Sequence, residues 1–361
     1  VLARLLGGMD RMRFEQMVIS LKPAGAVADQ IQKHGIPVAS PGFTPGFPNP
    51  VAVYKLIKLI RHFKPDVIQT WMYHADLAGG LAARLAGRFP VVWGIRNNYL
   101  IPGASKARTV WIVRLLARLS NWVPARIVSC SETARLVHIG LGYRAEKFLV
   151  IPNGFDLERF HPDVSARCQV REELNLAPDT ELVGLVARFD PNKDHQNFVR
   201  AAGILLERRP GVHFLLCGEG ITPENPSLAV WIGETGEGEH FHLLGRRDDI
   251  PRLTAGLDIA SSASFSEAFP NVIGEAMACG VPVGATEAGD SAAILGSTGQ
   301  VVPRRDPPAL ATAWLKIFEM SPKERQVLSR VVRQRMVEQY SLEGMVSHYQ
   351  KLYESISSCS A

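Results

Sequence analysis

The chain has few cysteines for its length, and they follow no pattern that binds a metal or builds a disulfide framework. Five occur in 361 residues, and no two of them form a Cys-x-x-Cys pair. Neither a cysteine zinc site nor a disulfide-stabilised scaffold is indicated. A reducing cytosol is therefore the expected compartment.

Long hydrophobic runs are also missing. No apolar stretch reaches the roughly 18 residues that a membrane helix needs, and the first residues lack the charged, apolar and cleavage regions of a secretory signal. We therefore expect a cytoplasmic protein that is soluble or lies peripherally on the inner face of the cytoplasmic membrane. With 46% hydrophobic and 21% charged residues the composition is globular, and the length favours two domains.

Negative charge is scarce in the first part of the chain. Residues 1–155 hold 20 Lys and Arg against 7 Asp and Glu, a balance of +13, whereas the remaining residues hold 20 against 28, a balance of −8. A basic field attracts an anionic membrane, a polyphosphate ligand or nucleic acid, although an ordinary solvated surface also fits. No recognition motif accompanies the charge, so nucleic acid is not expected as a partner.

Short β-branched or apolar runs alternate with longer amphipathic stretches along the chain. This rhythm is typical of βαβ units, and it predicts an α/β protein with two Rossmann-like, doubly wound domains. Helices are expected between the strands, for example over residues 197–209. The predicted strands are residues 16–20, 67–70, 91–94, 127–129, 181–187, 212–217, 241–244, 258–261, 281–284 and 300–302.

The domain boundary is predicted at the segment Ile-Pro-Asn-Gly-Phe-Asp, residues 151–156. Proline and Asn-Gly punctuate the chain there, where the charge balance changes sign. We place the first domain at residues 1–153 and the second at residues 154–340, with a hinge and a cleft between them. A last helix is expected from residue 341, and the pattern alone does not tell which domain it packs against.

The run SFSEAFPNVIGEAMACGVPV, residues 264–283, reads as a loop, a helix, a tight turn and a strand. Pro270 suits the first turn of the helix, and Gly280 suits a left-handed residue at its end. A helix amino terminus offers N–H groups and a positive dipole end to a phosphate. Glu267 and Glu275 flank it, and they can together contact a ligand of roughly 10 Å, such as a sugar joined through two phosphates to a ribose. Glu267 alone would also fit as a helix-dipole partner.

Two cations are predicted at the carboxyl edge of the same sheet. Arg188 follows the strand at residues 181–187, and Lys193 is expected to open the next helix. Ligands of open α/β sheets bind at this edge, and a guanidinium with an ammonium suits a diphosphate. Solvent-facing charges around a turn are the alternative. Asp248 and Asp249 resemble a metal-binding pair, but the Ile-Pro-Arg-Leu that follows favours a helix cap.

These motifs, in their order, resemble glycosyltransferase family 4 over nearly all of the chain. The resemblance implies a retaining enzyme of GT-B fold, with a sugar-nucleotide donor in the second domain, the acceptor in the first, and residues 341–361 crossing back to the first domain. The features that carry it are the Glu267-to-Glu275 run with its Ala-Met-Ala-Cys-Gly-Val-Pro-Val, Arg188 with Lys193, Ile-Pro-Asn-Gly at 151–154 and Phe-His-Leu-Leu-Gly at 241–245.

The resemblance also implies a role for each site residue. Glu267 would contact the transferred sugar and Glu275 the ribose hydroxyls, while Arg188 and Lys193 would neutralise the leaving diphosphate. Preorganised donors of this kind are worth about 3–4 kcal/mol each in a transition state, so no metal or other cofactor is expected. Backbone groups would complete the site. Those of Phe269, Asn271 and Val272, at the helix tip, would contact the diphosphate, and those around Leu244 would contact the base.

The chain departs from the family pattern in two places. Family members usually carry a histidine after the strand at residues 91–94, and this chain has Ile-Arg-Asn-Asn, which puts Arg96 there. His74, after the preceding strand, also points towards the cleft in this interpretation. Both are candidate contacts to the acceptor or the sugar, although a structural role fits His74 equally well. The second departure is that residues 1–6 already resemble the first helix, so we expect upstream residues to supply the usual opening strand and glycine-rich loop.

Residues 106–122 combine basic, aromatic and aliphatic side chains. Trp111, Arg114, Arg118 and Trp122 recur at helical spacing, so basic and aromatic groups would share one side, as in a helix that lies on an anionic membrane. A buried helix of the first domain would need similar apolar residues, so both interpretations stay open.

The sequence therefore favours a glycosyltransferase of cell-envelope polysaccharide synthesis, such as that of lipopolysaccharide. It would move a hexosyl or N-acetylhexosaminyl group from a UDP-sugar, or a GDP-sugar, to a lipid-linked or saccharide acceptor. The alternative of another class is a non-catalytic subunit that binds nucleotide sugar or acts as a scaffold, which the missing loop and histidine suggest. A related enzyme that epimerises or phosphorolyses sugars is disfavoured, because nothing resembles a pyridoxal-phosphate lysine site.

Overall fold

The computed structural model describes residues 1–23, 25–43, 49–97 and 107–358. It divides the chain into two compact units. Unit 1 consists of Val1–Gly154 together with Leu342–Ala361, and unit 2 consists of Phe155–Ser341.

Unit 2 is built on a six-stranded parallel sheet. Its strand order is β12-β11-β10-β7-β8-β9, so the first strand of the unit is central and the chain order reverses on the other side of it. Such a doubly wound sheet has a topological switch point, between β7 and β10, and ligands bind at the carboxyl ends of the strands there. The strands are β7 (Leu182–Val186), β8 (His213–Cys217), β9 (Phe241–Leu243), β10 (Ile259–Ser262), β11 (Val283–Thr286) and β12 (Gln300–Val302).

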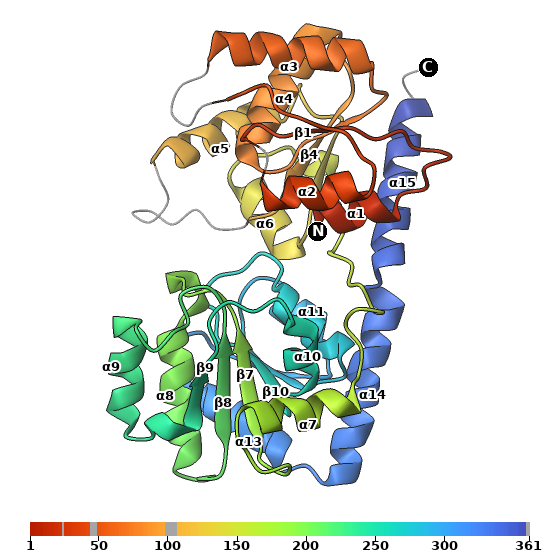
Figure 1. Cartoon of the computed structure of the whole chain (residues 1–361). Helices are drawn as coiled ribbons and strands as arrows, with labels where there is room; N and C mark the ends of the chain where they lie inside the picture. The colour runs from red at the N-terminus through yellow and green to blue at the C-terminus, as the bar shows by residue number, and fades with distance from the viewer. Residues whose placement is uncertain (24, 44–48, 98–106, 359–361) are drawn as a thin grey trace. The chain divides into compact units, whose positions relative to one another are not determined.

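Helices cover both faces of this sheet (Figure 1). The helices α8, α9 and α13 pack together on one face, and α7, α10, α11 and α14 pack together on the other. A mostly apolar sheet needs such cover on both sides. The bounds are α7 (Val164–Glu173), α8 (His195–Leu206), α9 (Pro226–Thr235), α10 (Ile250–Ala255), α11 (Asn271–Ala278), α12 (Ser291–Leu295), α13 (Pro307–Phe318) and α14 (Pro322–Gln339), with 3-10 turns η2 (Pro191–Lys193) and η3 (Gly238–His240).

An aromatic cluster fills the core of unit 2 under α8 and α13. Phe198 of α8 lies edge-on to Phe214 of β8 and to Trp314 of α13, with ring centroids 6.0 and 5.2 Å apart. All three side chains are fully buried. Edge-to-face packing of this kind adds to the stabilisation from burial, so the cluster makes the sheet a rigid base for the loops at its edge.

Unit 1 contains two separate parallel sheets within the described residues. Strands β3, β4, β5 and β6 pair in that order, and β1 pairs only with β2. The strands are β1 (Val18–Ile19), β2 (Val38–Ala39), β3 (Ile68–Gln69), β4 (Val91–Ile95), β5 (Arg126–Ser129) and β6 (Phe148–Val150). The helices are α1 (Leu2–Gly8), α2 (Ala26–Lys33), α3 (Pro50–Phe63), α4 (Tyr73–Ala86), α5 (Ala107–Leu119), α6 (Glu132–Gly140) and α15 (Leu342–Ser358), with the 3-10 turn η1 (Ala145–Lys147).

The last helix, α15, belongs to unit 1 because of its apolar face. Val346, Tyr349 and Leu352 recur at helical spacing, and all three are buried in one cluster with residues of α1, β4 and β5. The cluster members from those elements are Leu5, Val92 and Val128. The burial of this stripe ties the end of the chain to the unit in which the chain begins.

The prediction of an α/β fold with parallel sheets in two domains is confirmed, and the doubly wound order is seen in unit 2; in unit 1 the described strands form two separate parallel sheets, and the larger one keeps sequence order. Each of the ten predicted strands overlaps an observed strand. The strands β2 and β6, of two and three residues, were not predicted. Among the described helices, none is both long and apolar enough to cross a membrane.

Asp76 is an unusual residue of the unit 1 interior, since its side chain is only 1% exposed. It accepts hydrogen bonds from the Thr70 hydroxyl at 2.5 Å and from the Gly94 N–H at 3.3 Å. Burial raises its pKa to about 8, and the two hydrogen bonds only partly oppose that effect. In an unfolded chain an aspartate ionises near pH 4. Folding therefore keeps the Asp76 carboxyl protonated between about pH 4 and pH 8.

We predict that Asp76→Asn reduces the loss of folding stability that occurs as the pH rises. In the wild type, the folded state binds one more proton than the unfolded state between about pH 4 and 8, so the free energy of unfolding falls as the pH rises through that window. The amide cannot ionise, and the Tm of the variant relative to wild type should increase between pH 5 and pH 8. Thermal unfolding at both pH values checks this, and parallel Tm profiles for the two proteins would contradict it.

Candidate functional site

The eight site residues predicted in unit 2 all lie at the carboxyl edge of its sheet. Arg188 comes two residues after β7, Glu267 follows β10, and the switch point lies between these two strands. The carboxyl ends of parallel strands meet at one edge, so the fold brings these separate sequence motifs together. The remaining six are Lys193, Leu244, Phe269, Asn271, Val272 and Glu275.

Lys193 and Glu267 contact each other across the switch point. The Lys193 ammonium donates to Glu267 Oε1, and both side chains are mostly buried, at 20% and 14% exposed. The Ser264 hydroxyl donates to the same oxygen at 2.9 Å. Charge-assisted hydrogen bonds to a partly buried group restrict its orientation, so Glu267 is held in one place by a cation and a hydroxyl.

The backbone joins the same two loops. The N–H groups of Phe265 and Ser266 both donate to the carbonyl of Asn192, at 2.8 and 3.4 Å. The prediction that Lys193 opens a helix is wrong, because Lys193 ends the short 3-10 turn η2 and α8 begins only at His195, after the left-handed Asp194. The turn keeps Lys193 directed across to β10, whereas a position inside α8 would carry it along that helix.

Arg188 lies at the outer part of the site. Its side chain is 62% exposed, and its Nε and Nη2 donate to Asp190 Oδ2 at 3.2 and 2.8 Å. Burial alone would raise the pKa of Asp190, but the hydrogen bonds from Arg188 and from the Asn192 N–H lower it. Arg188 is therefore accessible, and its guanidinium is already oriented by a carboxylate.

The amino terminus of α11 forms the next part of the site. Pro270 precedes the first helical residue, Asn271, as the sequence predicted. The Phe269 side chain is buried and stacks on Phe155 with ring centroids 6.2 Å apart. Phe269 can therefore meet a ligand only through its backbone. The Ile273 N–H donates to the Pro270 carbonyl at 3.2 Å, and the first N–H groups of a helix point out along its axis.

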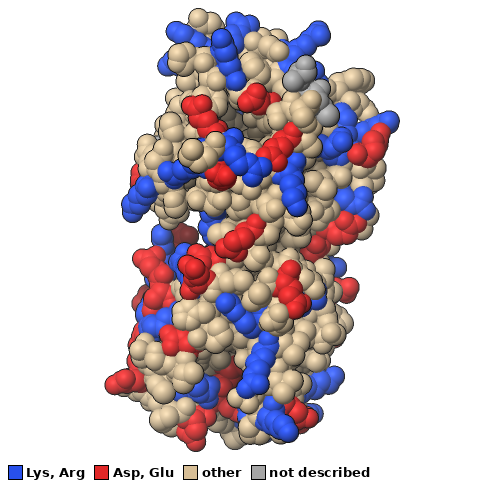
Figure 2. Space-filling model, turned by 90° about the vertical axis from the view of Figure 1, so that its right-hand side faces the viewer, with Lys and Arg blue, Asp and Glu red and all other residues tan. Residues whose placement is uncertain are grey.

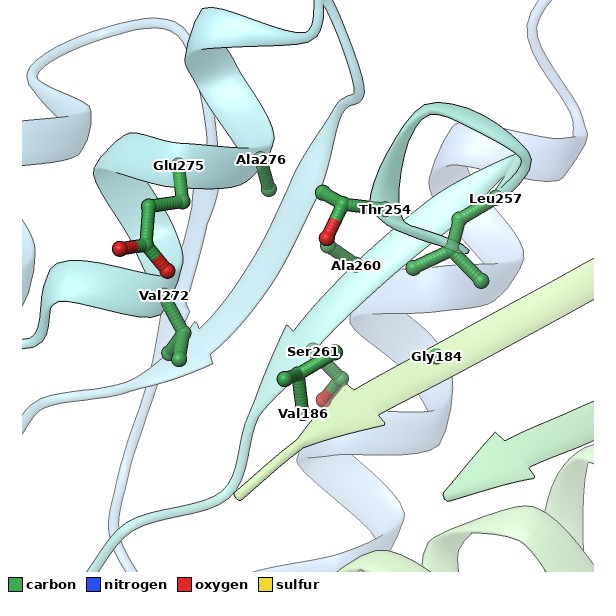
Figure 3. Close-up of a pocket in the computed structure, with 9 residues that line it drawn as sticks. All are labelled: Gly184, Val186, Thr254, Leu257, Ala260, Ser261, Val272, Glu275 and Ala276. Carbon is green, nitrogen blue, oxygen red and sulfur yellow. The ribbon is translucent and has the colours of Figure 1, made fainter. Parts of the chain in front are cut away.

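Glu275 lines a small pocket one turn further along α11. The pocket is bounded by residues of β7, β10, α10 and α11, and Figure 3 shows the Glu275 carboxylate beside Val272. Ser261 of β10 also lines it, and its buried hydroxyl has no hydrogen-bond partner among the described residues. Acceptor and donor groups thus face the same small space.

Two glycines allow the backbones of this site to approach closely. A Cβ on Gly274 of α11 would lie 2.2 Å from the Phe155 ring, so the helix can sit on that ring only with glycine there. Gly289 has a φ of +58°, and a Cβ there would lie 2.3 and 2.5 Å from the carbonyl oxygens of Glu267 and Ala268. The loop after β11 therefore supports the backbone of Glu267 directly.

Leu244 lies where the resemblance expects the base, but its N–H is already used. It donates to the Leu216 carbonyl at 3.0 Å as a continuation of the sheet, and the Gly245 N–H donates to Ile221 at 2.8 Å. A base that contacts this segment would need its other backbone groups, such as the Leu244 carbonyl.

Sequence reasoning missed two side chains of the site. Ser264 lies in the quoted run, yet only the structure shows that it holds Glu267. Arg305 follows β12, and its guanidinium lies 4.0 Å from the ring centroid of Phe265. The available signal was the pair Arg304 and Arg305 just beyond the last predicted strand, since it puts charge at the same sheet edge.

The acidic residues of unit 2 that resemble metal ligands lie outside this constellation. Asp249 occupies the N-cap position of α10 as expected, but its side chain does not cap the helix and instead accepts from Arg247 and Arg252. Hydrogen bonds from Arg247, above all, keep its pKa well below the usual range. Within the described ranges, the group with metal-ligand spacing is formed by Glu237, Glu239 and His240, at the amino end of β9.

The two site residues predicted in the first domain are both found in unit 1, after β3 and β4. His74 is largely exposed in the first turn of α4, and partial desolvation of its ring, followed by the positive charges of Arg108 and Lys22, lowers its pKa. Arg96 follows β4, and its guanidinium lies over the Trp71 ring, 4.3 Å from the centroid. Asn98, quoted with Arg96 in the sequence, lies outside the described residues.

Comparisons with known proteins show the family and the fold. Residues 180–320 match a family model described as glycosyl transferases group 1, and residues 1–159 match one described as Glycosyltransferase Family 4. The structure is similar to that of Anabaena HepE in complex with UDP and glucose, with a TM-score of 0.84, 23% identity, and coverage of 98% of this chain and 95% of that one. It is also similar to sucrose-phosphate synthase from Thermosynechococcus elongatus, with a TM-score of 0.76 at 19% identity, over 95% of this chain and 99% of that one.

The matches to curated relatives cover smaller parts of both chains than the matches to solved structures do. The Escherichia coli UDP-Gal:alpha-D-GlcNAc-diphosphoundecaprenol alpha-1,3-galactosyltransferase is 26% identical over 64% of this chain, and the match spans 60% of its own length. The Campylobacter jejuni N,N'-diacetylbacillosaminyl-diphospho-undecaprenol alpha-1,3-N-acetylgalactosaminyltransferase is 28% identical over 73% of this chain and 71% of its own. The motifs, the fold and both family models agree, and the chain belongs to glycosyltransferase family 4, with the GT-B fold.

Proposed function

We propose that this protein is a retaining, metal-independent glycosyltransferase that binds a UDP-sugar in unit 2. The observation that carries the proposal is the position of Arg188 and Lys193 on one side of the switch point, with Glu267 and the tip of α11 on the other. A sugar nucleotide would lie with its diphosphate against the two cations and the helix tip. Glu275 would take the ribose hydroxyls, and Glu267 the sugar.

The chemistry follows from where charge develops. Breaking a sugar–phosphate bond places negative charge on the diphosphate, while the sugar becomes oxocarbenium-like. The ammonium of Lys193 and the guanidinium of Arg188 would stabilise the first, and donors of this kind are worth about 3–4 kcal/mol each when preorganised. Glu267 would hold the sugar by accepting hydrogen bonds from its hydroxyls.

Both cations already have carboxylate partners without a ligand. Lys193 is paired with Glu267, and Arg188 with Asp190. An ammonium has three donors and a guanidinium five, so each has capacity left for phosphate oxygens. A diphosphate would therefore join existing networks, and the cost of bringing two bare cations together is avoided.

The acceptor is proposed to be a lipid-linked diphosphate sugar of cell-envelope polysaccharide synthesis. The E. coli and C. jejuni relatives act, by their names, on sugars linked to diphosphoundecaprenol. The balance of +13 over residues 1–155 supports an anionic acceptor in unit 1. A saccharide acceptor without the lipid is the less favoured form of the same proposal.

Helix α5 supports contact with an anionic membrane. Trp111, Arg114 and Arg118 of α5 are exposed, the tryptophan at 62%, while Ile112 and other apolar residues of α5 are buried. The helix ends at Leu119, short of the predicted Trp122, which lies in the following turn and is 69% exposed. Lys106, at the start of the expected helix, lies outside the described residues. An exposed face with both tryptophan and arginine suits a headgroup region. On the face drawn in Figure 2, acidic side chains lie among the basic ones, so no continuous basic patch appears on that side.

Binding of nucleotides tests the proposed donor site. We expect UDP and UDP-sugars to raise the Tm more than GDP-sugars and ADP-sugars do, because a ligand that binds only the folded state stabilises it in proportion to the logarithm of its concentration over Kd. Glu275→Ala should weaken UDP-sugar binding about tenfold or more, whereas Glu234→Ala, an exposed glutamate of α9, should not change it. Equal affinity in the Glu275 variant, or no nucleotide binding by the wild type, would sink the donor site.

A second prediction concerns the support of Glu267. Gly289→Ala should weaken UDP-sugar binding about tenfold or more, because the added Cβ would push against the carbonyl oxygens of Glu267 and Ala268. Gly236→Ala is the matched control, since Gly236 also has a positive φ, of +74°, but a Cβ there meets nothing within 4 Å. Both variants should lose stability from backbone strain. Calorimetric titration would count against this support if both variants bound alike.

The membrane contact predicts flotation with anionic liposomes. The protein should float with vesicles that contain phosphatidylglycerol and less with pure phosphatidylcholine, because the arginines of α5 add electrostatic attraction. A double change, Trp111→Ala with Trp122→Ala, should reduce flotation severalfold, and Val230→Ala, 58% exposed in unit 2, should not. The proposed membrane contact would be contradicted by a protein that floats with neither vesicle, or by a double tryptophan variant that floats as well as the wild type.

A further inference from the structure

Arg96 has an environment unlike that of any other cation described above. Its Nη1 and Nη2 atoms are both buried, and neither has a hydrogen-bond partner among the described residues. The side chain as a whole is only half-buried, and it lies over the Trp71 ring at 4.3 Å from the centroid. A guanidinium presents five N–H donors and keeps its charge at any physiological pH.

The surroundings do not satisfy this cation. The Trp71 ring attracts the positive charge, but it offers no acceptor to N–H groups in the plane of the guanidinium. Two phenols come close enough to act on it electrostatically, those of Tyr349 and Tyr353, and burial raises the pKa of both, so they stay neutral. The Tyr353 hydroxyl is already directed to Gln69 Oε1, at 3.2 Å. A buried charge without a partner is costly and calls for an explanation.

The position of Arg96 points to a ligand. It follows β4 at the carboxyl edge of a parallel sheet, the edge at which such sheets bind ligands. The neighbouring segment is tied to the first turn of α4, because the Tyr73 hydroxyl donates to the Asn97 carbonyl at 3.1 Å. His74 lies in the same turn, and the charges of Lys22 and Arg108 reach it strongly enough to contribute to the lowering of its pKa. Lys22 and Arg108 therefore add positive charge near this edge to that of Arg96, while the His74 ring stays neutral at pH 7, and the field of the three cations favours an anion.

We propose that Arg96 is the anion-binding residue of the acceptor subsite, and that its forked guanidinium takes phosphate oxygens of a lipid-diphosphate acceptor. This inference rests on the proposed function. Two parallel N–H donors match two phosphate oxygens, which an ammonium does not. The ligand supplies the missing partner of the buried nitrogens, and the half-exposed side chain reaches it by moving off the Trp71 ring. The remaining cations of this edge attract the acceptor without fixing its orientation.

The oxyanion could instead be the carboxylate of a uronic acid in a saccharide acceptor. That anion also pairs with an arginine fork, so the chemistry is shared and the probes must separate the sources. Farnesyl diphosphate represents the lipid diphosphate, inorganic pyrophosphate the phosphates alone, and glucuronic acid the carboxylate. Each is titrated calorimetrically into the full chain with saturating UDP present, so that the diphosphate site of unit 2 is already filled.

We expect farnesyl diphosphate and pyrophosphate to bind the wild-type protein under these conditions. Arg96→Gln should weaken the binding of both probes at least tenfold. Arg96→Lys keeps the charge but loses the fork, so its affinity should lie between those of the wild type and Arg96→Gln. The Kd for UDP should be unchanged in both variants, because Arg188, Lys193 and Glu275 are intact. Arg96→Met, which keeps packing on Trp71, should leave Tm unchanged or higher, as removal of an unpaired buried charge does not destabilise the folded chain.

Three results would overturn the proposal. One is wild-type affinity for both phosphate probes in Arg96→Gln. Another is Arg96-dependent binding of glucuronic acid without binding of either diphosphate, which would make the ligand a carboxylate. The third is a fall in Tm in Arg96→Met larger than the loss of the cation–π attraction to Trp71 accounts for, which would show that Arg96 has a further structural partner. In all three cases UDP binding can remain normal, and then the donor site stands, whereas a wild-type protein that fails to bind UDP refutes the proposed function itself.

Discussion

The site in unit 2 depends on the way two loops are joined across the switch point of its sheet. The Asn192 carbonyl accepts from Phe265 and Ser266, and beside it Lys193 pairs with Glu267. These contacts join the turn after β7 to the loop after β10, so the cation and the acid of the site cannot move independently. Everything proposed for the donor, from the diphosphate to the sugar, relies on this junction and on the rigid sheet beneath it.

The site cations of the two units differ in whether they have hydrogen-bond partners within the protein. In unit 2 the two cations of the site are paired with carboxylates before any ligand arrives, Lys193 with Glu267 and Arg188 with Asp190. In unit 1 the terminal nitrogens of Arg96 are buried and have no partner among the described residues. A paired site can admit a ligand by sharing donors, whereas an unpaired buried guanidinium gains its first acceptor from the ligand. This contrast suits a donor held by an existing network and an acceptor selected by its own charge.

Much of this architecture could be predicted from the sequence, and the limits have physical causes. Strand positions, the start of α11 at Asn271 and the left-handed Gly280 follow from local patterns. The turn that carries Lys193 could not be predicted from such patterns, because a 3-10 turn and the start of a helix look alike in sequence. The hydrogen bond from Ser264 to Glu267 depends on the conformation of a single loop, the support from Gly289 depends on two different loops, and the burial of the Arg96 nitrogens depends on packing. Local patterns do not contain such information.

The structure of the protein with bound UDP would test the central claim most directly. The account predicts that phosphate oxygens lie within hydrogen-bond distance of Lys193 Nζ and of the Arg188 guanidinium, near the first N–H groups of α11, with the ribose hydroxyls on Glu275. A diphosphate bound elsewhere, with Lys193 paired only to Glu267 and Arg188 directed into solvent, would contradict it.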